Sequence, residues 1–266
     1  MNKPTRLPLL FLGHGNPMHT LSENRFTQLW QSLGQNLPRP RAILVISAHW
    51  MESHFALTGQ AHPPTIHDFS GFPPAMYQLQ YQAAGAPDLA AQLQKRLPQW
   101  QLKLDQEWGY DHGTWCILRH MYPDADIPVL QLSLNSQASA QAHFQLGQDL
   151  AALREEGVLI IGSGNIVHHL GRLTQQTQAY PWAQAFQDQF LEKLLARDFA
   201  ALIDFEHLEQ ANLAIPTTEH YLPLLPILGA IQDDDDLGVL NQELEMGSIS
   251  MLSFIADLRN TTEQGK

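Results

Sequence analysis

Four short runs of mostly apolar residues stand out along the chain, at residues 7–12, 42–47, 128–134 and 158–162. Runs of this length are typical of strands. Apolar side chains at nearly successive positions indicate strands that are covered on both faces. We therefore expect these four segments to be buried strands of one sheet.

The segments between these runs carry the helical period. Apolar residues recur three or four positions apart in three sets: Leu89, Leu93 and Leu97; Leu146, Leu150 and Leu153; Phe186, Phe190 and Leu194. Pro87 and Asp88 suit the first turn of the first helix, and Pro181 precedes the third. Strands that alternate with helices predict an α/β fold with a central, mostly parallel or mixed sheet and helices on both faces. No repeat or long linker divides the sequence, so residues 1–266 are expected to form a single domain.

Composition narrows the classes of function. The formal net charge is -12, from 15 Lys and Arg against 27 Asp and Glu, and no basic run occurs. Nucleic acids and anionic membranes are therefore not expected as partners. Cys116 is the single cysteine, which excludes an internal disulfide and a cysteine-rich zinc site. Without a long apolar span or a secretory signal, a cytoplasmic protein is expected.

Histidine is frequent: the chain has 13, nearly as many as Lys and Arg together. Three of them, His14, His49 and His168, each follow one of the predicted strands. Open α/β sheets bind ligands at the carboxyl ends of their strands. One such histidine is more often structural, but three at equivalent positions favour a metal site. Neutral imidazoles on a rigid sheet suit Zn, Fe or Cu.

A fourth candidate ligand, His220, lies in a segment expected to begin a short helix capped by Thr217 or Thr218. His62 and His67 lie in a stretch rich in proline and aromatic residues, which is either the rim of an active site or an irregular surface loop. The histidines whose context does not point inward are expected at the surface: His19, His54, His143 and His207.

His112 has a different setting, between aromatic residues and next to Asp111, which could cap the following helix. An imidazole surrounded by rings, away from a strand end, suits a proton donor or acceptor beside a flat substrate. The structural alternative is a capping loop that packs on Trp108 and Trp115.

Six segments, in this order, resemble the class III extradiol ring-cleaving dioxygenases, specifically the DOPA 4,5-dioxygenase-like group. They are FLGHG (11–15), SAHW (47–50), PPTIHDF (63–69), DHGTW (111–115), SGNIVH (163–168) and EHYLP (219–223), and EMGS (245–248) extends the likeness. No segment is specific alone, but six in order are. The resemblance implies a single α/β domain that opens the ring of a catechol such as DOPA with O2.

The resemblance also implies roles for individual histidines. His14, His49 and His220 would hold one non-haem divalent metal ion, with His168 as a further ligand or a neighbouring base, and His112 would be the acid/base. Many extradiol enzymes hold Fe(II) with two histidines and a carboxylate. Here His220 stands where the carboxylate is expected, beside Glu219. Fe(II) is then the expected working ion, and an all-imidazole site would also accept Zn(II).

Four side chains are candidates for contact with the flat substrate, three of them by ring stacking, although aromatic residues are more often core: Trp50, His67, Tyr110 and Trp115. Trp108 is a further stacking candidate. The identity of the catechol and the oligomeric state are not predicted.

Two other functions stay open. A zinc hydrolase could use a metal-bound water with His112 as base, and O2 consumption would distinguish it from a dioxygenase. A non-catalytic metal-binding protein of the same fold is the second alternative. A serine hydrolase is disfavoured, because Gly162-Ser163-Gly164 lacks the G-x-S-x-G spacing of a nucleophile elbow.

Overall fold

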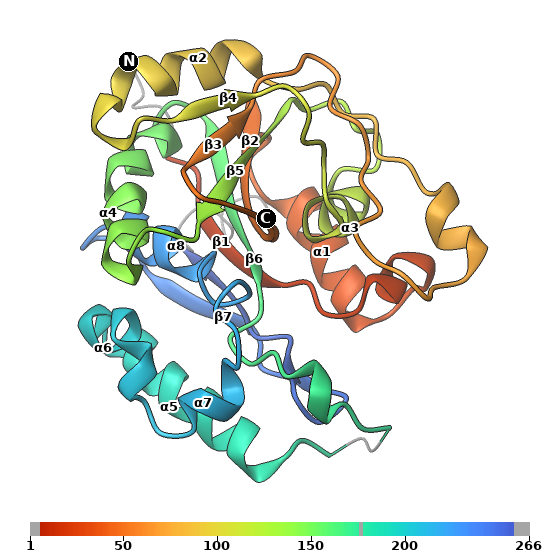
Figure 1. Ribbon diagram of the computed structural model, residues 1–266, viewed down its shortest axis with the longest axis vertical. Coiled ribbons are helices and arrows are strands. Elements are labelled where there is room, and N and C mark those ends of the chain that lie inside the picture. The colour runs from red at the N-terminus through yellow and green to blue at the C-terminus, as the bar shows by residue number, and fades with distance from the viewer. Residues whose placement is uncertain (1–5, 176–177, 258–266) are drawn as a thin grey trace, which may run out of the picture.

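A computed structural model describes residues 6–175 and 178–257, and its centre is an eight-stranded sheet (Figure 1). The strand order is β4-β3-β5-β2-β6-β1-β10-β7. The strands are β1 (Leu9–Gly13), β2 (Ala42–Glu52), β3 (Ala56–Thr58), β4 (Lys103–Asp105), β5 (Val129–Asn135), β6 (Val158–Gly164), β7 (Leu237–Asn241) and β10 (Ser253–Ala256). A separate pair consists of β8 (Leu244–Glu245) and β9 (Ile249–Ser250).

The middle of the sheet is parallel, as predicted. Strand β6 pairs in parallel with β1 on one side and β2 on the other, and β2 pairs in parallel with β5. Strands β10 and β7 add an antiparallel edge next to β1. All four predicted strands are present, and β2 and β6 continue past their predicted ends to Glu52 and Gly164.

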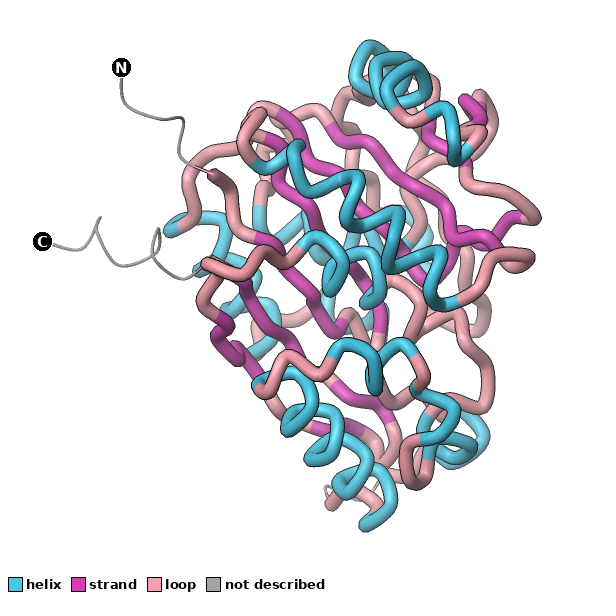
Figure 2. Tube along the Cα trace, turned by 90° about the vertical axis from the view of Figure 1, so that its left-hand side faces the viewer, coloured by secondary structure: helices cyan, strands magenta, loops and turns pink. Residues whose placement is uncertain are grey.

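Both faces of the sheet are covered, which explains the continuous apolar runs. In β1, Leu9 and Phe11 join one buried cluster, whereas Leu10 and Leu12 join another on the opposite face. Figure 2 shows the strands with helices in front of them and behind them. The fold class expected from the sequence is confirmed.

The helices are α1 (Arg25–Asn36), α2 (Pro87–Arg96), α3 (His112–Met121), α4 (Ala140–Leu150), α5 (Pro181–Leu195), α6 (Phe199–Ile203), α7 (Ala211–Ala214) and α8 (Leu224–Ala230). Helices α1 and α3 pack together in the cluster on one face, and α4 and α8 in the cluster on the other. The three predicted helices correspond to α2, α4 and α5. No helix of the described residues is long and apolar enough to cross a membrane.

Two of the histidines expected at the surface are not there. His143, on α4, is fully buried, where its Nδ1 bonds to the carbonyl of Ser139 (2.9 Å) and its ring packs edge-on against Phe55. His19 is largely covered, with its Nε2 2.7 Å from a carboxylate oxygen of Glu245. That expectation was wrong for both, because Phe55 packs against His143 and Glu245 bonds to His19 from distant parts of the chain. His207 is exposed, as expected.

Candidate metal centre and substrate cavity

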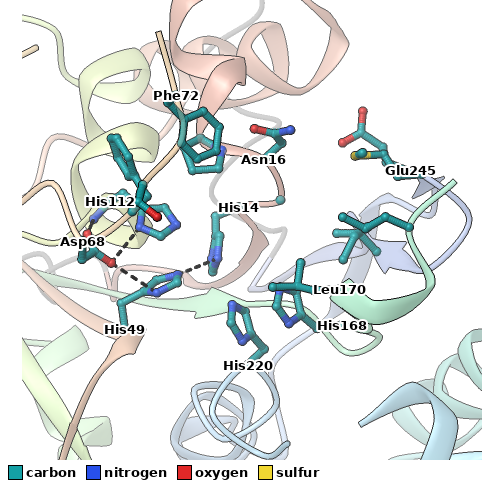
Figure 3. A pocket seen from close by; sticks show the side chains of 17 residues that line it. His14, Asn16, His49, Asp68, Phe72, His112, His168, Leu170, His220 and Glu245 are labelled. Atoms are coloured by element: carbon teal, nitrogen blue, oxygen red, sulfur yellow. Dashed lines mark hydrogen bonds and ion pairs between the residues drawn. The ribbon is translucent and has the colours of Figure 1, made fainter. Parts of the chain in front are cut away.

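A cavity of about 340 Å³ opens at the carboxyl ends of the parallel strands (Figure 3). Five histidines line it: His14, His49, His112, His168 and His220. The last parallel pairs of the central strands are Gly13 with Gly164 and Ser47 with Ser163. His14, His49 and His168 come just after these pairs, so one edge of the sheet brings them together.

Two local expectations need correction. His49 does not follow a strand but lies inside β2, at a break in the register between Ile46 and Met51. His220 lies in a turn rather than at a helix start. The carbonyl of Thr218 accepts from the amides of Tyr221 and Leu222, and the helix α8 begins only at Leu224.

The end of β6 holds the His220 turn in place. The amide of Asn165 donates to the carbonyl of His220 over 2.9 Å. At Gly164 a side chain would overlap that same carbonyl oxygen, so glycine permits the approach. The fourth histidine is thereby brought to the edge where the other ligand candidates lie.

Ser163 sets the orientation and protonation of His14. Its Oγ donates to the carbonyl of Gly113 over 2.6 Å, so its lone pairs face the Nδ1 of His14, which is 3.0 Å away. The proton of the neutral His14 ring is therefore on Nδ1. The lone pair of Nε2 is left for a cation, as in metal sites whose ligating histidines donate their other ring N–H to a fixed partner.

Asp68 fixes the orientation and the tautomer of two rings, those of His112 and His49. Its Oδ2 is 2.7 Å from Nδ1 of His112 and 3.3 Å from Nδ1 of His49, and its Oδ1 accepts from the backbone of His112 over 2.8 Å. Both imidazoles thus carry their proton on Nδ1 and turn Nε2 away from the carboxylate. Sequence reasoning missed Asp68, although it stands beside His67 in one of the quoted segments.

Glu219 supports His220 from behind. Its Oε1 lies 3.3 Å from Nδ1 of His220 and accepts from the hydroxyl of Thr217 over 2.7 Å. Burial raises the pKa of Glu219, but these hydrogen bonds outweigh it and bring the pKa to about 2. Glu219 is therefore a carboxylate that orients a histidine, and it does not line the cavity.

The three rings expected to bind metal form an almost equilateral triangle. The centroids of His14 and His49 are 5.0 Å apart, those of His49 and His220 5.1 Å, and those of His14 and His220 5.3 Å. Imidazoles that bind one ion through nitrogens at about 2.1 Å, at roughly tetrahedral angles, have ring centres about 5 Å apart. The spacing of the three rings fits a single ion.

The electrostatics of the site also fit a cation. The Nε2 atoms of His14 and His49 are 3.1 Å apart, with both lone pairs directed to the same space. Burial, and then the neighbouring imidazoles, lower the pKa of both rings well below the ordinary value. Burial also lowers the pKa of His220, although Glu219 opposes this. The rings are therefore neutral near pH 7, which is the form that binds metal.

His168 and His112 are less clearly ligands. His168 stacks on His220, with centroids 3.4 Å apart and an interplanar angle of 11°. Burial, and then His220, lower the pKa of His168 to about 3. His112 can offer a nitrogen within 4.8 Å of those of His14 and His49. The geometry alone therefore allows His112 as a ligand as well as an acid/base.

Asp111 anchors the start of α3. Its side chain accepts from the amide of Thr114 as the helix cap and from the hydroxyl of Ser47 over 2.6 Å. Burial raises the pKa of Asp111 to about 6. The expected cap is confirmed, and it also ties the His112 helix to the strand that carries His49.

None of the four side chains expected to contact substrate lines the cavity. Trp50 is buried and stacked on Trp108, Tyr110 donates to the carbonyl of Val129, and Trp115 donates to the carbonyl of Ile66. His67 donates to the carbonyl of Leu79. His67 and Trp115 both pack against Phe69, so these two residues support the cavity wall from outside.

The wall itself is mostly apolar. Its apolar side chains include Phe69, Phe72, Leu170, Leu173 and Ile249. Phe69 and Phe72 belong to the proline-rich stretch, so that stretch is a rim of the cavity, although His67 is not part of the lining. Asn16, Ser70 and Glu245 add polar groups. No pattern in the sequence distinguishes these residues from ordinary loop residues.

We expect Ser163→Ala to weaken metal binding about 10- to 100-fold, because His14 loses the partner that fixes its ring. Competition with a chelator would measure the affinity. Ser53→Ala, at an exposed serine in the turn after β2, is the matched control and should leave affinity unchanged. Equal affinities for the two variants would contradict the role assigned to Ser163.

Residues 8–251 match the family described as the catalytic LigB subunit of aromatic ring-opening dioxygenase. A 4,5-DOPA dioxygenase extradiol of Escherichia coli (strain K12) is 46% identical over 94% of both chains. One of Beta vulgaris is 37% identical over 92% of this chain and 94% of the relative. The crystal structure of an uncharacterized protein from Escherichia coli K12 superimposes with a TM-score of 0.83 at 42% identity, covering 94% of this chain and 99% of that one.

Proposed function

Because the chain belongs to the LigB family of catalytic subunits of aromatic ring-opening dioxygenases, we propose that His14, His49 and His220 hold its metal. The chain is an extradiol enzyme of the DOPA dioxygenase type, and its proposed substrate is a catechol such as DOPA. The observation that carries this proposal is the triangle of three neutral imidazoles at one end of an apolar cavity. One bound divalent ion would supply the positive charge that favours the catecholate and an open position for O2.

His112 is our candidate for the proton transfers. Asp68 holds its Nδ1–H, which leaves the Nε2 lone pair to accept a proton from a catechol hydroxyl. The resulting imidazolium is stabilised by the same carboxylate at 2.7 Å. His112 can then return the proton to an oxygen atom derived from O2 as the ring opens, and that oxygen stays in the product. His168, neutral and stacked on His220, is proposed as a neighbour of the metal that helps to shape the substrate site.

The apolar wall positions the ring and excludes water. Phe69 and Phe72 are in contact, with centroids 5.0 Å apart, and Phe69 also packs against His112. A flat ring whose oxygens are at the histidines would lie against these side chains. Excluding water strengthens each electrostatic interaction of the site and protects the reactive intermediates.

Fe(II) is the proposed working ion. Glu219 bonds to His220 and lies outside the cavity lining, so the ligand set is all imidazole and is equally suited to Zn(II). Zinc has no accessible redox change and cannot support the reaction with O2. A cytoplasmic location and one catalytic domain over residues 1–266 complete the proposal; the ends of that range, 1–5 and 258–266, lie outside the described residues.

An oxygen-electrode assay tests the proposal. Protein reconstituted anaerobically with Fe(II) and then given DOPA in air should consume O2 and form a yellow ring-opened product, whereas the Zn(II)-loaded protein should do neither. A hydrolase or a non-catalytic metal-binding protein would consume no O2. Absence of O2 uptake with every member of a panel of catechols would refute the proposal.

A further inference from the structure

One wall of the cavity carries a single acidic side chain away from the metal centre. Glu245, on β8, lines the cavity beside Met246 and Ile249, and Figure 3 places it on the opposite side from His49 and His112. Glu245 also lines a smaller adjoining hollow together with His19. Its carboxylate is therefore positioned to meet the part of a substrate that extends away from the diol.

The backbone holds Glu245 in a fixed place. It pairs with Ile249 across the β8–β9 hairpin, and its carbonyl accepts from the amide of Ser248 over 3.2 Å. Met246 and Gly247 have φ of 49° and 78°, the positive values that a type I′ turn requires. The carbonyl of Gly247 is also bonded to the amide of Tyr180. These contacts fix the backbone of the β8–β9 turn that carries the carboxylate of Glu245.

His19 contacts the carboxylate of Glu245 as a hydrogen-bond donor. As the cap of α1, Asn24 accepts two backbone amides at its Oδ1, which turns its Nδ2 toward Nδ1 of His19, 3.1 Å away. That Nδ1 is consequently the acceptor. The proton of a neutral His19 is on Nε2, which donates to Oε2 of Glu245 over 2.7 Å. His19 therefore fixes the position of the carboxylate through this hydrogen bond.

No cationic side chain offsets this charge within the site. Among the described residues that line the cavity and the adjoining hollow, there is no Lys and no Arg. An uncompensated carboxylate at the edge of an apolar cavity attracts a cation and repels an anion. The described lining therefore offers a charged partner for an ammonium group and no Lys or Arg for a carboxylate.

We propose that Glu245 binds a protonated amine on the side chain of the catechol and so selects amine-bearing substrates. This inference rests on the proposed function, and for DOPA it assigns the α-ammonium group to Glu245. Hydrogen bonds between charged groups are the stronger class. Dopamine, which lacks the carboxylate, should accordingly be bound at least as well as DOPA. Dihydroxyphenylpropanoate, which lacks the amine, should be bound worst.

Glu245→Gln is the test, because glutamine keeps the volume and the oxygen that accepts from His19 but removes the charge. We expect KM for DOPA and dopamine to rise about 10- to 100-fold, with kcat little changed. KM for dihydroxyphenylpropanoate should fall, because a repulsion is removed. Glu243→Gln is the matched control: it makes the same charge change two residues away, at a carboxylate that pairs with Arg25 and is not part of the lining.

Equal changes in KM for the amine-bearing and amine-free catechols would overturn the inference. Calorimetric binding of the same three compounds without O2 keeps the test independent of turnover. If the native chain bound amine-bearing catechols in preference, and lost this preference with Glu245→Gln, the assignment of Glu245 would stand even where no O2 was consumed. In that case it is the proposed function that would fail.

Discussion

His14→Ala should abolish stoichiometric metal binding and lower ring-opening activity at least about 1,000-fold, because a catalytic metal contributes several kcal/mol and each 1.4 kcal/mol is a factor of ten. His14 is buried, its Nδ1 is held by Ser163, and its Nε2 faces that of His49 at 3.1 Å. Elemental analysis of the reconstituted protein measures the first effect, and an oxygen electrode measures the second.

The control for His14 is His207→Ala. His207 has a side chain that is 79% exposed and lies outside the cavity lining, so its loss should change neither metal content nor activity. A His14→Ala protein that retained one ion per chain would remove His14 from the ligand set. The ion would then have to be held by another combination of the clustered histidines.

His112→Ala should lower kcat about 100- to 10,000-fold, the usual contribution of a general acid/base, while metal content stays at the native level. The retained metal is the decisive part of this result, since a nitrogen of His112 can lie within 4.8 Å of those of His14 and His49. The residue is bonded through Nδ1 to Asp68, which leaves one nitrogen for proton transfer.

His62→Ala provides the comparison for His112. His62 is an exposed histidine in the proline-rich stretch and does not line the cavity, so kcat should be unaffected. If His112→Ala lost its metal together with its activity, His112 would be a ligand. The proton transfers would then have to be assigned to His168.

The location of the site could be predicted because it depends on strand ends. Apolar runs mark buried strands, and parallel strands that neighbour one another end at one edge of the sheet. His14 follows β1, His49 lies in β2 and His168 lies in the loop after β6, and these three strands are neighbours in the sheet. The pattern of apolar runs along the chain therefore predicted that these three rings lie close together, and this prediction required no information about side-chain packing.

The substrate wall could not be predicted in the same way. Trp50 follows His49 in β2, and successive side chains of a strand point to opposite faces, so a ring next to a cavity histidine is directed into the core. Because the sequence predicted that this strand ended at residue 47, the alternation could not be used to exclude Trp50. Tyr110 and Trp115 are buried, and their side chains donate to the backbone carbonyls of Val129 and Ile66. No local sequence pattern reveals these contacts.

The residues that support the histidines were hidden for a similar reason. Asp68, Ser163 and Glu245 act through partners far away in sequence, and a carboxylate or hydroxyl in a loop is usually solvated. The antiparallel strand β10 likewise joins β1 from the far end of the chain. Long-range contacts of this kind depend on the assembled fold and leave no periodic signal in the sequence.

The most direct test of the account is the fate of isotopically labelled dioxygen in the reaction of the Fe(II)-loaded protein with DOPA. An extradiol dioxygenase places both atoms of one O2 molecule in the ring-opened product. Mass spectrometry of that product should therefore show two heavy oxygen atoms, and one O2 should be consumed for each catechol. A product with one heavy oxygen atom or none would contradict ring opening by a dioxygenase at this histidine centre.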